Sequence, residues 1–399
     1  MKKVSLLFFS VMFVIGTDTF LISPLLPTLR NAYHISTGIS GFLVSAYAFG
    51  YAIFAFIAGP ISDCFDRKKV MSIGLLAFAV STFLCGLSPN FYTMILFRLL
   101  AGVSASFVTP QVWASIPVLV EPKNIVKSMG YATAGLSISQ MLGIPIGSYL
   151  AALSWHTPFF VISACAIILM IFIFISLPSL PSAIDLTKKR NSVLQTYMDL
   201  FKTSKALPYI FAYFVFQTGN FAAFSFIGSW FTADFSLQVA SVGAAMIALG
   251  LGNTFGSLFG SHLIKKMGEP KSLFLALIGM IVLYAILPFS INLVMAEIVL
   301  FVIFLIGGFI FPVFMSTFQS LTTTARGTIS AVSNAAMYGG TTLGGAIGGF
   351  LLAHFSGFIG IAFFTVIMYT ISLLVYAGTG IFRVSKGIKK TSQKVQKVN

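Results

Sequence analysis

The chain has 399 residues, of which 57% are hydrophobic and only 8% are charged, and it carries 43 Phe. An average soluble domain is about 25% charged, so this composition excludes an ordinary soluble fold and indicates a bilayer as the solvent. In lipid, only helices or a closed barrel satisfy the backbone. The stretch 159–177 is apolar almost without a break, which predicts a membrane helix and not a barrel strand of alternating polarity.

The net charge of +15 comes from clusters of basic residues between the apolar runs. These clusters are Lys2–Lys3, Arg67–Lys69, Lys123–Lys127, Lys188–Arg190, Lys202–Lys205, Lys265–Lys271, Arg326 and the tail from Arg383. They occupy every second gap, while the other gaps hold little beyond Arg30. This positive-inside pattern predicts a multi-pass protein of the cell membrane with both termini in the cytoplasm. A basic tail could also bind nucleic acid, but a solvated tail beside a membrane needs no such partner, so we expect none.

Apolar length and turn residues predict an all-α membrane protein with twelve transmembrane helices in two pseudo-symmetric six-helix bundles. The predicted spans are 4–27, 39–60, 70–87, 91–116, 128–152 and 158–177, then 208–232, 238–262, 272–289, 292–320, 328–353 and 358–382. The domains are an N-terminal bundle (1–177), a cytoplasmic linker loop (178–207), a C-terminal bundle (208–382) and a basic cytoplasmic tail (383–399). The first apolar stretch is too long for a cleavable signal peptide and lacks a small-residue cleavage site, so we expect it to remain as a helix.

Residues of the first half recur in the second half at a shift of 202 positions (292 − 90). The matched pairs are Asn90 with Asn292, Pro110 with Pro312, Gly143 with Gly345, and Gly147 with Gly349. At the same shift the loop Asp63–Arg67 meets Lys265–Glu269 with its charges inverted. Two such halves are expected to pack as parallel repeats, with a substrate path between them.

Asp18 is the one acidic residue well inside the predicted spans of the first half. At roughly 1.5 Å per residue it lies about 13 Å from the outer surface. Desolvation favours the protonated form of a carboxyl group there, whereas a nearby guanidinium favours the charged form. Asp18 is therefore a candidate for proton coupling. It could instead neutralise a cationic substrate or simply accept a hydrogen bond from Thr17 or Thr19.

Between spans two and three, the order Gly-x-x-x-Asp-x-x-x-Arg-Lys-Lys places Gly59, Asp63 and Arg67 at regular intervals. A small residue lets a neighbouring helix approach closely. A carboxylate at a helix C-terminus is unfavourable unless a cation or another helix N-terminus meets it, so the loop is a candidate conformational latch. An ordinary charged loop that obeys the positive-inside rule is the simpler alternative.

Two further charged side chains lie within predicted spans. Arg98 is about 10 Å deep in span four, where an arginine costs several kcal/mol unless it is paired or hydrated. It is therefore a candidate functional residue, unless it snorkels to the surface. Glu297 lies about 7 Å from the outer end of span ten. It is either an interfacial residue or a further protonation or cation site.

Span five carries Gly135 and the sequence Gly143-Ile144-Pro145-Ile146-Gly147. Glycines four residues apart thin one helix face, and the proline removes a backbone hydrogen bond and bends the helix. Generic helix packing would explain the same residues.

Three of these features resemble motifs of the major facilitator superfamily. The loop around Asp63 resembles the signature loop of that family, although it has Asp66 where a glycine is usual and Cys64 where a basic residue is common. Arg98 with Gly102 resembles the fourth-helix motif associated with proton coupling. The order Gly-x-Pro-x-Gly in span five resembles the antiporter motif of proton-coupled exporters, in the variant of the sugar- and drug-efflux branch. The resemblance implies a bacterial twelve-helix exporter.

The remaining candidates are polar or amphipathic residues within spans that could line a substrate cavity. They are Tyr47, Gln111, Trp113, Gln140, Gln217, Asn220, Asn253, Asn334 and Tyr338. Aromatic faces with a few amides suit a broad apolar substrate, and cations in particular. Each residue could instead form a helix–helix hydrogen bond. The three cysteines and four histidines show no ligand spacing, so no metal is expected, and a Walker motif for ATP is absent.

These features together predict a proton-coupled exporter (antiporter) of small amphipathic or cationic compounds such as drugs. We expect it to work by alternating access as a monomer, with protons as the coupling ion and no cofactor. A lipid flippase, an uptake symporter or a sugar or nucleoside efflux transporter of the same fold is the nearest alternative. A non-transporting sensor would need a soluble domain, and the longest loop is too short to bury a core. A membrane enzyme would need paired reactive groups at one depth, so no enzymatic activity is expected.

Overall fold

The computed structural model describes residues 2–180, 198, 200–203, 205–321 and 326–382, except the side chains at 2, 59–64, 123, 126, 261, 265, 319 and 326–328. The regular elements in this part of the chain are all helices, and eleven of them are long and apolar enough to cross a membrane. The predicted linker loop lies largely outside the described residues, and the basic tail lies entirely outside them.

The first half contains six spanning segments, several of which are interrupted. They are α1 (Lys2–Ala32), α2 (Thr37–Ser40) with α3 (Phe42–Cys64), α4 (Arg67–Gly86), α5 (Phe91–Leu119), α6 (Ile125–Ile138) with α7 (Ile144–Leu153), and α8 (Thr157–Ser176). The short 3₁₀ turn η1 (Pro122–Asn124) precedes α6, and the π-helical turn η2 (Ser139–Gly143) joins α6 to α7.

The second half repeats this order. Its segments are α10 (Ala206–Phe235), α11 (Val239–Ala245) with α12 (Ile247–Met267), α13 (Glu269–Ile286) with the 3₁₀ turn η3 (Leu287–Phe289), α14 (Leu293–Gln319), α15 (Arg326–His354) and α16 (Ile359–Gly378). The segment α15 is 29 residues long. It is not one of the eleven strongly apolar helices because Gly, Ser and Thr dilute its hydropathy. With it, the predicted twelve-helix fold is confirmed.

The predicted boundaries differ from the observed ones where proline and glycine were expected to act as helix ends. The first helix continues to Ala32 with Pro24 and Pro27 inside it, as membrane helices tolerate. The second and eighth spans each break near their start, at Gly41 and Met246. The matched asparagines of the repeat both cap their helices: Oδ1 of Asn90 accepts from the Thr93 amide at 3.0 Å, and Oδ1 of Asn292 accepts from the Met295 amide at 2.9 Å.

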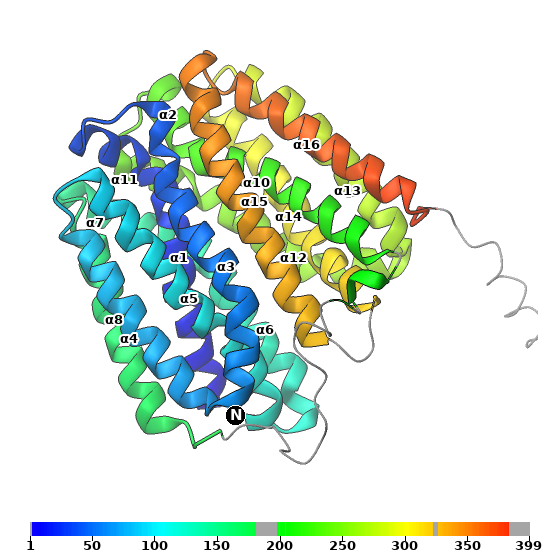
Figure 1. The fold of residues 1–399 in the computed structure, drawn as a ribbon. Coiled ribbons are helices and arrows are strands. Elements are labelled where there is room, and N and C mark those ends of the chain that lie inside the picture. Colours follow the sequence, from blue (N-terminus) through cyan, green and yellow to red (C-terminus); the bar gives the residue numbers. More distant parts are fainter. Residues whose placement is uncertain (1, 181–197, 199, 204, 322–325, 383–399) are drawn as a thin grey trace, which may run out of the picture.

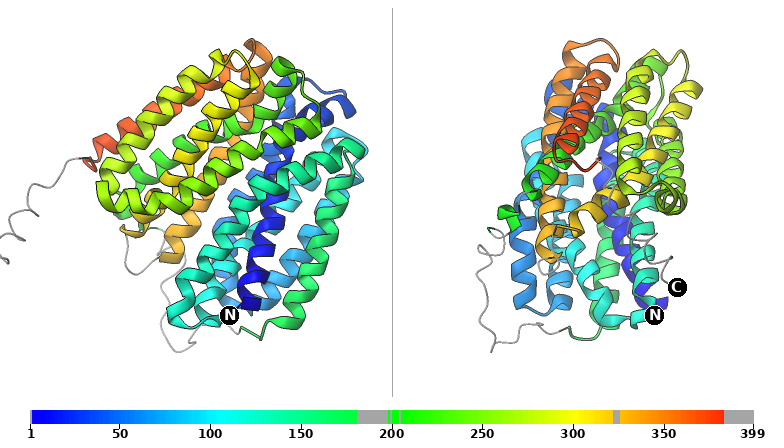
Figure 2. Two further views of the ribbon diagram at one scale, coloured as in Figure 1. Left: turned by 180° about the vertical axis from the view of Figure 1, so that it is seen from behind. Right: turned by 90° about the vertical axis from the view of Figure 1, so that its right-hand side faces the viewer.

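The two halves form separate helix bundles that meet at one end (Figure 1). Helix α3 packs on α15, α1 on α10 and α7 on α11. Seen from the front and from behind, the halves converge at the end that carries α2 and α11 and diverge toward the N-terminus (Figures 1 and 2). At the closed end Gly41 lies against the backbone carbonyl of Gly345, where a Cβ atom would clash. Glycine therefore permits backbone contact between the bundles there.

Candidate coupling and substrate site

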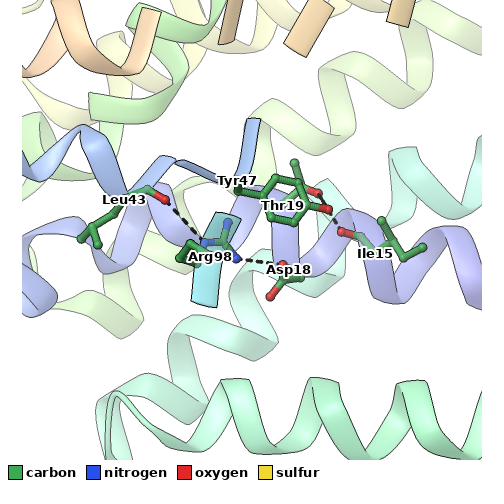
Figure 3. Close-up of polar contacts among 6 residues, drawn as sticks. All are labelled: Ile15, Asp18, Thr19, Leu43, Tyr47 and Arg98. Atoms are coloured by element: carbon green, nitrogen blue, oxygen red, sulfur yellow. Dashed lines mark hydrogen bonds and ion pairs between the residues drawn. The ribbon is translucent and has the colours of Figure 1, made fainter. Parts of the chain in front are cut away.

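Asp18 and Arg98, which the helix rise predicts at similar depths in the membrane, form an ion pair. Nη1 of Arg98 donates to Oδ2 of Asp18 at 2.8 Å, and each residue is only 1% exposed (Figure 3). The other carboxylate oxygen, Oδ1, is buried and has no hydrogen-bond partner among the described residues. Arg98 is therefore buried and paired, and it does not snorkel to the surface.

Helix α3 holds the arginine from its other side. The Cζ atom of Arg98 lies 4.6 Å from the centroid of the Tyr47 ring, within cation–π range, and Nε lies 3.5 Å from the carbonyl oxygen of Leu43. Gly102, one helical turn after Arg98, lies against the backbone of Tyr47, so that a Cβ atom there would clash with the carbonyl. The arginine–glycine pair thus lets α5 lie directly on α3 while the guanidinium reaches α1.

The glycines of span five let α6, η2 and α7 lie close to α1, the helix that carries Asp18. Gly135 lies against the Phe9 carbonyl, Gly143 against the Thr17 side chain and Gly147 against Leu21. These three positions follow α1 along one face, and any larger residue would push α6 and α7 away from it.

Pro145 stands at the start of α7, directly after the π-helical turn η2. Its missing N–H interrupts the helical hydrogen-bond ladder, and a π turn is one way in which a helix absorbs such an interruption. At the predicted bend the helix type changes from α to π and back to α.

The threonines beside Asp18 do not hydrogen-bond to its carboxylate. Thr17 Oγ1 donates to the Phe13 carbonyl and Thr19 Oγ1 to the Ile15 carbonyl, each at 2.8 Å. Thr19 also lies 3.2 Å from the Tyr47 hydroxyl (Figure 3). In this structure Asp18 therefore depends on Arg98, and the pair is neutral only while Asp18 is ionised.

A small cavity lies beside the arginine, between the two halves. Its volume is about 10 Å³, which is room for about one water molecule. The lining residues are Thr19, Ser23, Val44, Tyr47, Ala48 and Arg98 from the first half, and Phe221, Phe224, Ser225, Tyr338 and Thr341 from the second. Tyr47 and Tyr338 were expected here. The hydroxyl and Phe residues were not, because they resemble the ordinary composition of a membrane helix.

The amides expected in the cavity bond to one another instead. Nδ2 of Asn253 donates to Oε1 of Gln140 at 2.6 Å, which links η2 to α12 across the two halves. Nδ2 of Asn220 donates to Oε1 of Gln217 at 3.2 Å within α10. These four residues do not line the cavity.

Three other predicted lining residues also lie elsewhere. Gln111 is fully buried in α5, and Trp113 and Asn334 are partly buried, but none of them contributes to the cavity wall. Their role in a substrate cavity stays a prediction, because helix periodicity alone does not show which face of a helix points inward.

Glu297 is partly exposed on α14, and no ion pair joins it to another residue in the described part of the chain. The structure does not bring it to Asp18 and Arg98. No three His, Cys, Asp or Glu side chains of the described residues are grouped closely enough to hold a metal ion.

The predicted latch is described in part. Gly59 and Asp63 belong to the last turns of α3, but their side chains lie outside the described residues. Arg67 begins α4, and its Nη1 donates to the Ala114 carbonyl near the end of α5 at 2.7 Å. The guanidinium thus ties the start of α4 to α5.

The unusual Asp66 in that loop has a clear structural role. Its Oδ1 accepts from the Lys68 amide at 2.9 Å, which caps α4, and from the Leu180 amide at 3.1 Å, while Oδ2 accepts from the Ser179 hydroxyl. Partial burial works against the charged carboxylate, but the hydrogen bonds from Ser179, Leu180 and Lys68 outweigh it and lower the pKa of Asp66. The segment after α8 is thereby fastened to the loop.

The charge-inverted copy of the loop makes a corresponding contact. Oε1 of Glu269, at the start of α13, accepts from the Ser316 hydroxyl near the end of α14 at 2.6 Å. Glu269 and Ser316 lie 202 positions after Arg67 and Ala114 (269 − 67 and 316 − 114). The repeat thus preserves a polar contact between equivalent helices, although donor and acceptor have changed places.

Comparison with known proteins places the chain in a family. The family model of the Major Facilitator Superfamily matches residues 8–338 and 209–397. The MFS-type transporter YceJ of Bacillus subtilis (strain 168) is 55% identical over 370 residues, 93% of this chain and 94% of that protein. Multidrug resistance protein 2 of the same organism is 34% identical over 42% of each chain. Quinolone resistance protein NorA of Staphylococcus aureus (strain COL) is 25% identical over 88% of this chain and 90% of its own.

Solved structures share the fold. A bacterial homologue of the human lysosomal transporter Spinster, in an inward-facing and occupied conformation, aligns with a TM-score of 0.75 at 14% identity over 94% of this chain and 95% of its own. The D-xylose–proton symporter aligns with a TM-score of 0.75 at 15% identity over 93% and 96% of the two chains. This chain is a multi-pass membrane transporter that belongs to the Major Facilitator Superfamily.

Proposed function

We propose that this transporter is a proton-coupled exporter that exchanges protons for small amphipathic compounds such as drugs. The observation that carries the proposal is the buried ion pair of Asp18 and Arg98 beside a cavity between the two halves. An intramembrane ion pair is costly to maintain and marks a functional site by default. The drug-resistance relatives and the fifth-helix motif support export over uptake.

The pair supplies a simple coupling chemistry. A proton that binds to the unpartnered Oδ1 of Asp18 removes the negative charge that holds the guanidinium. Arg98 then has to find another acceptor, and it already lines the cavity. Proton binding on α1 and substrate binding in the cavity are thereby linked through one side chain. The membrane potential contributes about 2.3 kcal/mol per charge per 100 mV to such a cycle.

The arrangement of the halves fits one stage of alternating access. If the basic clusters lie in the cytoplasm, the closed end with Gly41 and Gly345 faces outward, and the diverging end faces the cell interior. The protein is then in an inward-facing state, from which an exporter loads its substrate. We expect it to act as a monomer in the cell membrane with both termini in the cytoplasm.

The experiment is uphill export from proteoliposomes under an imposed pH gradient, with wild type and Asp18→Asn compared at equal reconstitution. We expect the variant to lose gradient-driven export while it still equilibrates substrate. Glu121→Gln, which removes an exposed carboxyl group after α5, is the control and should behave like wild type. Undiminished gradient-driven export by Asp18→Asn would refute proton coupling through this residue.

A further inference from the structure

Two tyrosines from opposite halves stack face to face where α3 packs on α15. The rings of Tyr51 on α3 and Tyr338 on α15 have centroids 3.7 Å apart and planes inclined by 22°. Tyr51 is buried at 1% exposure. Such a separation is ordinary contact distance for two aromatic rings, so nothing lies between them.

This stack joins the substrate cavity on one side. Tyr338 lines the cavity, and its ring centroid lies 6.5 Å from that of Tyr47, which in turn carries the guanidinium of Arg98 on its face. Phe221 and Phe224 of α10 complete an aromatic wall. The site therefore offers ring faces at one end and a cation at the other.

The cavity has to grow before it can hold a substrate, because about 10 Å³ accommodates only a water molecule. The tyrosine stack is the contact that can open at little cost. It connects the two halves, which alternating access would move relative to each other, and a flat ring inserted between the tyrosines recovers two stacked faces for the one that is lost. A bulky saturated group would separate the two rings and would not restore a stacked face.

The charge of the lining argues against a cationic substrate. Arg98 lines the cavity, and no carboxylate among the described residues does so. Asp18 lies behind the guanidinium and is already paired with it. A cation would find no free carboxylate in this lining, whereas a carboxylate or carbonyl oxygen would find the N–H donors of Arg98 that Asp18 does not use.

We infer that Tyr51 and Tyr338 form the recognition site for a flat aromatic substrate that carries a carboxylate or carbonyl group. The ring inserts between the two tyrosines, and the oxygen faces Arg98. The inference names the substrate class of the exporter proposed above and rests on that proposal only for the direction of transport. It narrows the expected substrates from small amphipathic or cationic compounds to flat, neutral or acidic aromatic compounds.

Equilibrium dialysis of the purified protein in detergent, without any proton gradient, tests this inference apart from coupling. Four probes separate shape from charge: acridine carboxylate, aminoacridine, adamantane carboxylate and adamantane amine. We expect acridine carboxylate to bind most tightly and both adamantanes to bind at least about tenfold more weakly. Tyr51→Leu should weaken the acridines about fivefold to tenfold, the loss of one stacked face, and should leave the adamantanes unchanged.

Matched variants exclude a folding defect. Tyr51→Phe and Tyr338→Phe keep the ring and should retain acridine binding, and Tyr149→Leu removes a lipid-facing tyrosine that is 65% exposed and should bind like wild type. Equal binding of acridines and adamantanes, or an equal loss of both in Tyr51→Leu, would overturn the inference that the substrate is flat and aromatic. Tighter binding of aminoacridine than of acridine carboxylate would overturn the inference that the substrate carries an acidic or carbonyl group. Because no gradient is applied, neither result depends on proton coupling.

Discussion

The ion pair of Asp18 and Arg98 predicts how the variants of these two residues rank in stability. Removing one partner of a buried pair typically costs about 3–5 kcal/mol, because the other charge is left buried without compensation. Both residues are only 1% exposed, so solvent screening does not reduce this value much. The two single variants should nevertheless differ. In Asp18→Asn the guanidinium keeps its proton at any accessible pH, whereas in Arg98→Met the remaining carboxyl group can take up a proton and become neutral.

We therefore expect Asp18→Asn to lose the full 3–5 kcal/mol of unfolding free energy and Arg98→Met to lose less. The double variant Asp18→Asn/Arg98→Met buries no charge and should be more stable than Asp18→Asn alone. The double-mutant cycle should then give a coupling of about 1–3 kcal/mol. Denaturant titration in mixed micelles, followed by intrinsic fluorescence, measures all four proteins.

Glu121→Gln is again the control for the loss of a carboxyl group that the pair does not use. Additive losses in the double variant would show that the two charges do not depend on each other in the folded protein. A larger loss of unfolding free energy in Arg98→Met than in Asp18→Asn would also contradict the predicted neutralisation of the unpaired Asp18. Transport separates the two roles of the pair, because the double variant should fold well and still fail to couple export to a pH gradient.

Three further predictions concern contacts outside the pair. Gly143→Val should separate η2 from α1 and lower gradient-driven export. Gly130→Val, where a Cβ atom meets no neighbour within 4 Å, should not, and equal activity of the two variants would contradict the packing role of Gly143. The pKa of Asp66 is lowered in the folded protein, so its hold on the Leu180 amide should persist at neutral pH and weaken as the pH falls through that lowered value. Hydrogen exchange at Leu180 should become faster in Asp66→Asn and lose this pH dependence; unchanged exchange would exclude the contact. Glu269→Gln should keep the hydrogen bond to α14 and preserve transport, while Glu269→Ala should slow it, as measured by initial export rates; equal rates would argue against a role in the conformational cycle.

The sequence predicted the depth of Asp18 and Arg98 because the helix rise converts residue number into distance from the membrane surface. It could not predict that they touch, since that depends on how α1 and α5 are rotated about their axes. Gly102 lets α5 lie on α3, and Gly143 lets η2 lie on α1, so the helices pack closely around the pair. The positions of both glycines were visible in the motifs, but the partner of each glycine was not.

The amides show the limit of the same reasoning. Gln140 and Asn253 were expected to face a substrate because polar groups are costly in lipid. The structure satisfies them by pairing them with each other at 2.6 Å, which removes the cost equally well. Tyr51 was missed for the opposite reason: a tyrosine in a membrane helix is unremarkable alone, although it follows Tyr47 by one turn and so shares its face.

The two proposals meet at Arg98, and their combination explains how one side chain could serve both proton and substrate. The guanidinium has Asp18 on one side and the cavity with Tyr47 on the other. A substrate oxygen accepts from the N–H donors of Arg98 that Asp18 leaves free, so the substrate binds while the pair is ionised. Exchange of substrate for protons requires that the proton and the substrate exclude each other at the site. Protonation of Asp18 would provide this exclusion, because the released guanidinium would turn into the cavity that it already lines and take the space of the substrate. Loss of the proton on the inner side would return Arg98 to Asp18 and clear the cavity for the next substrate molecule.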